Sequence, residues 1–427
     1  MRNHSYLGIA LLAMSVYGTI LAQEPPAVQQ KVLQSRDNNQ ATNRTAAERK
    51  SFRSIEDALK EPDKANRLDL RGPNITEIPA TIGQLTNLEA LTVSGTKIVK
   101  LPAEIGKLSS LKRLDIRSNQ LTELPPEISS LTQLQVLDAS NNKIVVLPSG
   151  LGGLKALQKL NLGKNALTSL PESVGELKAL TEFDVSENQL TALPAAVGTM
   201  DGLKILRLSS NKITSFPAAI GKMKKLSALM LGSNQLTSLP DIAEMENLSD
   251  LDVSGNQLSV LPPSLGKLAD LRSLNVENNK LSTVPADLTA MTQLTQLMLS
   301  GNGIKTLPPT IGALKELRYL KASDNQLEEL PAEIGNLEKL DRLELKNNQL
   351  KSIPPAIGKL INLRTLDLSN NQLTQFPITE IRKLSKLRQI MLMDAAAPDN
   401  RIAPMQRGRE MSPDKVREMR QPSPQKQ

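Results

Sequence analysis

The sequence of 427 residues contains no cysteine, no tryptophan and one histidine, His4. His4 lies in an amino-terminal segment that we expect to be removed, so the remaining chain is predicted to have neither histidine nor cysteine. This excludes Ser-His and Cys-His nucleophiles, zinc sites built from these residues, and their ligation of haem or iron-sulfur clusters. We therefore predict no catalytic residue, no cofactor and no metal site.

Aromatic residues make up only 2% of the chain, and leucine recurs at short, fixed intervals instead. A hydrophobic core of this composition has to be assembled from many small aliphatic layers, as in repeat proteins. Tyr319 is unusual because the other two tyrosines, Tyr6 and Tyr17, lie in the segment expected to be lost. The presence of this one tyrosine in the repeats therefore requires a specific explanation.

The chain begins with Arg2, an apolar run and the small residue Ala22 before polar Gln23. This pattern is typical of a secretory signal peptide over residues 1–22, and an uncleaved membrane anchor is the alternative. No cysteine is available for lipid attachment, so we expect a periplasmic or extracellular protein without stable membrane insertion after cleavage. Residues 23–50 and 394–427 lack hydrophobic periodicity and are predicted to be a disordered spacer and a disordered tail.

The formal net charge is +8, but basic and acidic residues alternate throughout the chain. Nucleic-acid binding requires a concentrated basic surface, which this sequence does not show. We therefore predict no nucleic-acid partner and attribute the charge to solubility.

Residues 65–393 divide into fourteen rows of 23 residues and a partial closing row, with one residue fewer in the row starting at Leu226 and one more in the row starting at Leu363. Each row begins L-x-x-L-x-L, whose alternation predicts a short strand with the third and fifth places outward. A row cannot fold alone, so the strands are expected to stack as one parallel sheet, with short helical or 3₁₀ turns returning the chain.

The ninth place of twelve rows is asparagine. A buried carboxamide can satisfy backbone groups left unpaired where the strand ends, so we interpret this column as structural. The column comprises Asn119, Asn142, Asn165, Asn188, Asn211, Asn234, Asn256, Asn279, Asn302, Asn325, Asn348 and Asn371. Before the rows, residues 51–64 are predicted to form a capping helix with Ser54 as its N-cap.

The pattern L-x-x-L-x-L-x-x-N-x-L-x-x-L-P-x-x-I-G-x-L resembles the leucine-rich repeat family, and within it the 23-residue class of the Ras-pathway scaffold, plant Ras-group and disease-resistance proteins. The resemblance implies an α/β fold, a right-handed solenoid (horseshoe) with a concave parallel sheet and convex turns. It also implies binding of a protein or peptide partner. Because exported animal and plant members usually carry cysteine-rich caps, a chain without cysteine is more similar to a bacterial exported member.

We predict that function lies on the outward places, the third, fifth, seventh and eighth of each row, which are expected to face the concave side; most residues there are polar and the fifth place is often acidic. Apolar residues there should form two diagonal patches, Tyr319 with Met298 and Ile205 with Met230, suited to a partner with two apolar anchors and a basic middle. The predicted contact residues are Ile205, Arg207, Met230, Asp250, Asp252, Met298, Tyr319, Lys321 and Arg342.

Two alternatives remain at this point. One is passive binding of a glycan or cell wall, for which a single exposed tyrosine would be a small platform. The other is a glycan hydrolase whose carboxylate pair would be Asp115 and Asp138 on adjacent strands. Such a spacing arises in any repeat with an acidic fifth place, so it is weakly specific.

Overall fold

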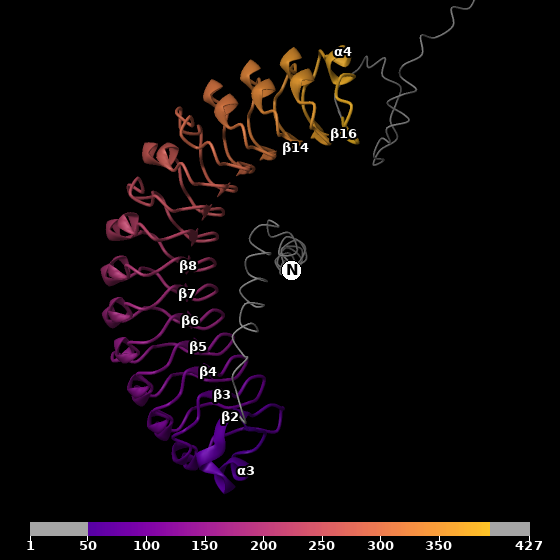
Figure 1. The fold of residues 1–427 in the computed structure, drawn as a ribbon. Coiled ribbons are helices and arrows are strands. Elements are labelled where there is room, and N and C mark those ends of the chain that lie inside the picture. Colours follow the sequence, from indigo (N-terminus) through magenta and orange to yellow (C-terminus); the bar gives the residue numbers. More distant parts are fainter. Residues whose placement is uncertain (1–49, 393–427) are drawn as a thin grey trace, which may run out of the picture. The chain divides into compact units, whose positions relative to one another are not determined.

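The computed structural model describes residues 50–392, which form one sixteen-stranded sheet with its strands in sequence order (Figure 1). The strands β2 to β16 pair in parallel, each with the next. The sheet does not close on itself, and its strands line the inner side of the stacked rows while the turns lie outside (Figure 1). This is a leucine-rich-repeat solenoid of the horseshoe type, as predicted.

The strands are β1 (Lys50–Phe52), β2 (Ala65–Asp69), β3 (Ala90–Thr92), β4 (Arg113–Asp115), β5 (Val136–Asp138), β6 (Lys159–Asn161), β7 (Glu182–Asp184), β8 (Ile205–Arg207), β9 (Ala228–Met230), β10 (Asp250–Asp252), β11 (Ser273–Asn275), β12 (Gln296–Met298), β13 (Tyr319–Lys321), β14 (Arg342–Glu344), β15 (Thr365–Asp367) and β16 (Gln389–Met391). The strand β1 was not predicted from the sequence. It adds a strand beside β2, before the first row.

The strands of the rows use the third, fourth and fifth places, and the fourth place is buried while the third and fifth are at least partly exposed, except for the buried Thr92 in β3. In β13, for example, Leu320 is fully buried and Tyr319 and Lys321 are partly exposed. Equivalent places pair across neighbouring strands, as Gln296 pairs with Tyr319 and Met298 with Lys321. The outward places therefore form continuous columns across the inner face.

The asparagine column joins each row to the one before it. Asn211 is buried, and its Nδ2 donates to the Leu208 carbonyl of its own row at 2.9 Å and to the Val185 carbonyl of the previous row at 3.0 Å. Its Oδ1 accepts the Leu190 N–H at 3.0 Å. Each amide thus satisfies backbone groups that the three-residue strand leaves unpaired, which confirms the structural interpretation of this column.

The eighth place, just before each asparagine, has a left-handed backbone. In the fourteen rows it is glycine four times (Gly72, Gly95, Gly255, Gly301) and another residue ten times, with φ between 53° and 58° at those ten. The sequence had suggested that this place simply faces the inner side. The structure shows that it makes the turn out of the strand, which explains why small and polar residues such as Ser118, Asn141 and Asp324 occupy it.

The outer turns are 3₁₀ in most rows and helical in the last complete one. These elements are η2 (Ala80–Gln84), η3 (Ala103–Lys107), η4 (Pro126–Ser130), η5 (Leu151–Gly153), η6 (Glu172–Glu176), η7 (Ala195–Thr199), η8 (Ala218–Lys222), η9 (Pro263–Lys267), η10 (Pro309–Ala313), η11 (Ala332–Asn336), η12 (Pro355–Lys359) and α4 (Ile378–Ile381).

Two rows, those that begin at Leu226 and Leu271, have neither a 3₁₀ turn nor a helix on the outer side. In each of them an aspartate closes the turn instead: Asp241 accepts the Ala243 N–H at 3.0 Å, and Asp287 accepts the Thr289 N–H at 2.9 Å. The bond from the Ala243 N–H lowers the pKa of Asp241, and bonds from the Thr289 hydroxyl and then its N–H lower the pKa of Asp287. At the position where most other turns have the glycine of the repeat pattern, these rows have alanine or threonine. The short aspartate turn replaces the 3₁₀ turn there.

The amino-terminal end of the solenoid carries the helix α3 (Ile55–Lys60), followed by a 3₁₀ turn, η1 (Pro62–Lys64). The Ser54 side chain accepts the Asp57 N–H at 3.1 Å, as expected of an N-cap. Ala58 is fully buried, and Ile55 and Leu59 pack against the core. The helix therefore contributes apolar side chains to the first layer of the solenoid.

We predict that Asn211→Ala lowers the free energy of unfolding by about 1 to 3 kcal/mol, because buried N–H and C=O groups lose their partners. Denaturant titration followed by circular dichroism measures the change. The exposed amide Gln235 serves as the control, since Gln235→Ala should leave the midpoint almost unchanged. An unchanged midpoint for Asn211→Ala would show that water or a shifted backbone replaces the amide.

Candidate functional site

The fifth column of the inner face has a structural role in every row where it is aspartate or asparagine except the first, in which Asp69 binds the Arg71 side chain instead. Asp138 Oδ1 accepts the Ser140 N–H two residues later at 3.0 Å, and Asp252 accepts the Ser254 N–H at 2.9 Å. Such bonds turn the chain out of the strand, as in an Asx turn. The same bond is made by Asp115, Asn161, Asp184, Asn275 and Asp367.

Six of the fourteen rows lack this short acceptor at the fifth place: one has Thr92 in β3, and the other five lie between β8 and β14, on either side of β10 and β11. The residues there are Arg207, Met230, Met298, Lys321 and Glu344. None of these side chains is Asp or Asn, so formation of the local turn does not explain why these residue types occur at the fifth place. Four of the five belong to the contact residues predicted from the sequence, and Glu344 is new.

Tyr319 lies beside charged side chains of the next strand, β14. The Arg342 Cζ lies 5.5 Å from the centroid of the tyrosine ring, and the Glu344 carboxylate is near enough to the phenol to raise its pKa. Arg342 also lies 3.9 Å from Glu344, measured from Nη1 to Oε1. Burial raises the pKa of the phenol, and the charge of Glu344 raises it further against the opposing charge of Arg342. The ring therefore has a cation over one face and a carboxylate near its hydroxyl.

Lys321 extends back across β12 to Glu277 in the row of β11. Its Nζ lies 2.9 Å from Glu277 Oε1, and the two side chains are 33% and 15% exposed. This is an ion pair by distance, but the approach does not satisfy hydrogen-bond geometry, and Oε1 is buried. The sequence analysis missed Glu277. It stands at the seventh place, where most rows have serine or glycine, so its size and charge could have drawn attention to it.

The two predicted diagonals exist in the strand register. Met298 pairs with Lys321 and thus lies diagonal to Tyr319, and Arg207 pairs with Met230, which places Ile205 diagonal to Met230. The strands β10 and β11 separate the two diagonals. We call these side chains and their charged neighbours the inner-face cluster: Ile205, Arg207, Met230, Asp250, Asp252, Glu277, Met298, Tyr319, Lys321, Arg342 and Glu344.

Asp250 and Asp252 lie on β10, between the two diagonals as predicted. Asp250 Oδ2 accepts the Ser249 hydroxyl at 2.5 Å, and Asp252 accepts the Ser254 N–H. Burial raises the pKa of Asp252, and the nearby charge of Glu277 raises it as well. Both carboxylates already have protein partners, but each is partly exposed on the inner face.

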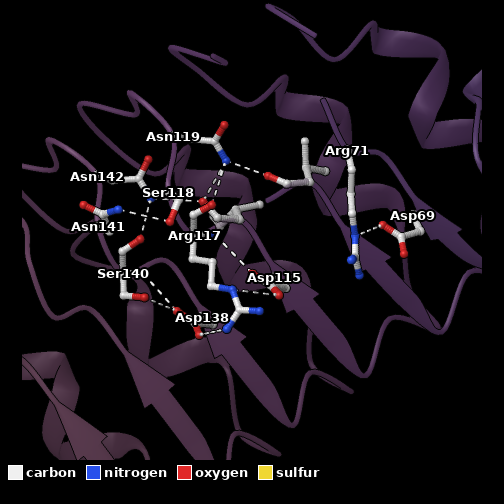
Figure 2. Close-up of polar contacts among 12 residues, drawn as sticks. Asp69, Arg71, Asp115, Arg117, Ser118, Asn119, Asp138, Ser140, Asn141 and Asn142 are labelled. Atoms are coloured by element: carbon white, nitrogen blue, oxygen red, sulfur yellow. Dashed lines mark hydrogen bonds and ion pairs between the residues drawn. The ribbon is translucent and has the colours of Figure 1, made fainter. Parts of the chain in front are cut away.

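The carboxylate pair of the hydrolase alternative is bridged by an arginine. Asp115 and Asp138 are register partners. The Arg117 Nε lies 3.4 Å from Asp115 Oδ2, and its Nη1 lies 3.9 Å from Asp138 Oδ2 (Figure 2). Asp138 also accepts the Ser140 hydroxyl at 2.6 Å. Burial raises the pKa of Asp115, while Arg117 opposes the shift. Each carboxylate therefore has a structural partner, which does not favour a free acid and base acting on a glycan.

Within residues 50–392, no group of three or more acidic or histidine side chains could hold a metal ion. In the same range no helix is long and apolar enough to cross a membrane. The predicted signal peptide and tail, and nearly all of the predicted spacer, fall outside the described residues.

Comparison with known proteins agrees with this geometry. The family described as "Leucine-rich repeat region" matches residues 91–166, 160–257 and 308–407, and a second described as "Leucine rich repeat" matches 246–304 and 269–327. The chain belongs to the leucine-rich repeat family. No curated protein matches it significantly.

Among solved structures, a leucine-rich-repeat protein of Leptospira interrogans is 35% identical with a TM-score of 0.64, over 80% of this chain and 99% of that one. An internalin, InlF of Listeria monocytogenes, is 27% identical with a TM-score of 0.61, over 80% and 89%. The ectodomain of the plant receptor kinase GASSHO1/SCHENGEN3 from Arabidopsis thaliana, in complex with CASPARIAN STRIP INTEGRITY FACTOR 2, is 32% identical with a TM-score of 0.61, over 81% and 46%.

We predict that Glu344→Gln lowers the phenol pKa of Tyr319, because the variant removes a negative charge near the hydroxyl. In the parent the raised pKa means that the neutral phenol stabilises the fold below the usual tyrosine pKa of about 10, a contribution lost as pH rises through the raised value. Alkaline titration by near-ultraviolet absorbance of a chain beginning at Gln23 reports Tyr319 alone. The exposed Glu329→Gln is the control, and equal titration of both variants would contradict the contact.

Proposed function

We propose that the protein is an exported, non-enzymatic scaffold or recognition module that binds a protein or peptide on the inner face of its solenoid. The observation that carries this proposal is the inner-face cluster, where methionine replaces the turn-forming aspartate at the fifth place of two rows and isoleucine and tyrosine occupy the third place of the row beside each. Aromatic and methionine side chains surrounded by charges are the usual composition of a binding hot spot.

Preorganisation supports this proposal. Arg342 and Glu344 lie beside the Tyr319 ring on the neighbouring strand, so little side-chain freedom would be lost when a partner covers it. The second diagonal, Ile205 and Met230, offers another apolar anchor, and Asp250 and Asp252 between them would suit a basic segment of the partner. The plant receptor ectodomain with its bound factor is a related solenoid that binds another molecule.

Glycan binding has weaker support. Sugars commonly dock on exposed aromatic faces, whereas the ring of Tyr319 is covered on one side by Arg342. The Asp115 and Asp138 carboxylates are bridged by Arg117, so the hydrolase alternative has no free carboxylate pair at that place. We therefore propose protein recognition without catalysis.

We predict that Tyr319→Ala and Met230→Ala each weaken binding of the partner by about thirtyfold, equivalent to about 2 kcal/mol at a hot spot. The partner is first captured from the native exported fraction with the parent protein and identified. Affinities are then measured with purified components by calorimetry. Val136→Ala, at the third place of β5, is the matched control because it removes a partly exposed apolar side chain outside the cluster.

Affinities are compared only among variants whose melting temperature equals that of the parent. Affinities within twofold of the parent for both Tyr319→Ala and Met230→Ala would refute the cluster as the binding surface. A captured glycan that binds the parent, in place of a protein, would favour the alternative.

Export gives a separate prediction. If residues 1–22 are a cleaved signal peptide, the secreted product should begin near Gln23, because Ala22 provides the small residue before the cleavage point. Intact-mass measurement of the protein from the exported fraction tests this. Recovery of the chain with Met1 intact in the membrane fraction would contradict it and support an uncleaved anchor.

A further inference from the structure

A second charged pattern lies at the other end of the inner face, away from the inner-face cluster. The sequences RLDLR at 67–71 and RLDIR at 113–117 place arginine, aspartate and arginine at the third, fifth and seventh places of two rows. The row between them has Ala90, Thr92 and Ser94 at the same places. We call Arg67, Arg71, Arg113 and Arg117 the arginine frame.

The strand register places the frame around a strip of short side chains. Ala90 of β3 pairs with Arg67 on one side and Arg113 on the other, and Thr92 pairs with Asp69 and Asp115. Because neighbouring strands lie about 4.8 Å apart, the two arginine-bearing backbones are about 10 Å apart, with only alanine, threonine and serine between them. Long guanidinium side chains therefore border a strip whose own side chains are short.

The four arginines differ in how far they are neutralised. Arg71 donates from Nε to Asp69 at 2.7 Å, and Arg117 pairs with Asp115 and Asp138 (Figure 2). Arg67 and Arg113 are exposed and form no ion pair with any residue between 50 and 392. The two rows contain four arginines, and three aspartates, Asp69, Asp115 and Asp138, lie among them, so the surface keeps one net positive charge with an acidic middle.

This arrangement selects a particular ligand chemistry. The third and fifth places are about 6.6 Å apart along a strand, which is also the spacing of alternate side chains in an extended peptide, and the seventh place lies two residues beyond the end of the strand. A peptide lying along the strip would present acidic side chains at its first and fifth residues to the arginines and a basic residue at its third to the aspartates. Guanidinium groups bind carboxylates in a planar fork, and the acidic middle disfavours a uniformly charged polyanion.

We infer that the arginine frame is a docking site for an extended peptide segment of a protein partner, with acidic residues four positions apart and a basic residue midway. It is independent of the proposed function at the inner-face cluster. A partner that occupied both surfaces would gain affinity from two linked contacts.

The test uses the full exported chain and a fluorescein-labelled peptide with the core Glu-Thr-Lys-Thr-Glu, measured by fluorescence anisotropy at low and physiological salt. The double variant Arg67→Gln/Arg113→Gln should weaken binding at least tenfold. The matched control, Arg272→Gln/Arg318→Gln, removes the same charge from exposed arginines also two rows apart, but at the second place, outside the inner columns. It should change binding less than twofold.

A steric variant, Ala90→Phe, fills the strip without changing any charge and should also weaken binding at least tenfold while melting stays unchanged. A peptide with the core Glu-Thr-Glu-Thr-Glu should bind more weakly than the probe, because its central carboxylate meets Asp69 and Asp115. Equal loss in both arginine double variants, no loss in Ala90→Phe, or tighter binding of the uniformly acidic peptide would overturn the inference.

Discussion

The asparagine column is the interaction on which the rest of the structure depends. A strand of three residues cannot satisfy the backbone that follows it, and a carboxamide that bonds to its own row and to the previous row completes the hydrogen bonds at each step. Because these groups are buried, the alternative would be unpaired polar atoms inside an aliphatic core. The residue types on the inner face can vary because the asparagines and the fourth-place leucines beneath it stabilise the fold.

The inner face itself has two kinds of side chain at the fifth place. Aspartate and asparagine form the local turn, and this accounts for the acidic column without any functional role. Arginine, methionine, lysine and glutamate between β8 and β14 do not form it, and among them Lys321 pairs with Glu277 and Glu344 lies beside Arg342. Whether a fifth-place side chain forms the local turn therefore distinguishes structural residues from candidate binding residues. Solvent exposure does not distinguish them, since both kinds are partly exposed.

Sequence periodicity was sufficient for the row boundaries, the parallel register and the two apolar diagonals, because a period of 23 fixes which residues pair once the rows stack. It was not sufficient for Glu277 and Glu344 as partners, since these contacts depend on how far a long side chain extends over neighbouring strands. Arg117 between Asp115 and Asp138 was missed for the same reason. The left-handed eighth place was missed because serine, lysine and glutamate there conceal a backbone preference that glycine would reveal.

The two rows of irregular length show where residues can be inserted into or deleted from such a chain. Both the missing residue after Leu226 and the extra residue after Leu363 fall in the outer turn, beyond the Leu-Pro or Phe-Pro step, and the spacing from strand to asparagine is the same in both rows. Insertions and deletions can therefore accumulate on the outer side, whereas the inner side can lengthen or shorten only by whole rows. Duplication of a row would extend the recognition surface by one strand and leave every existing contact in register.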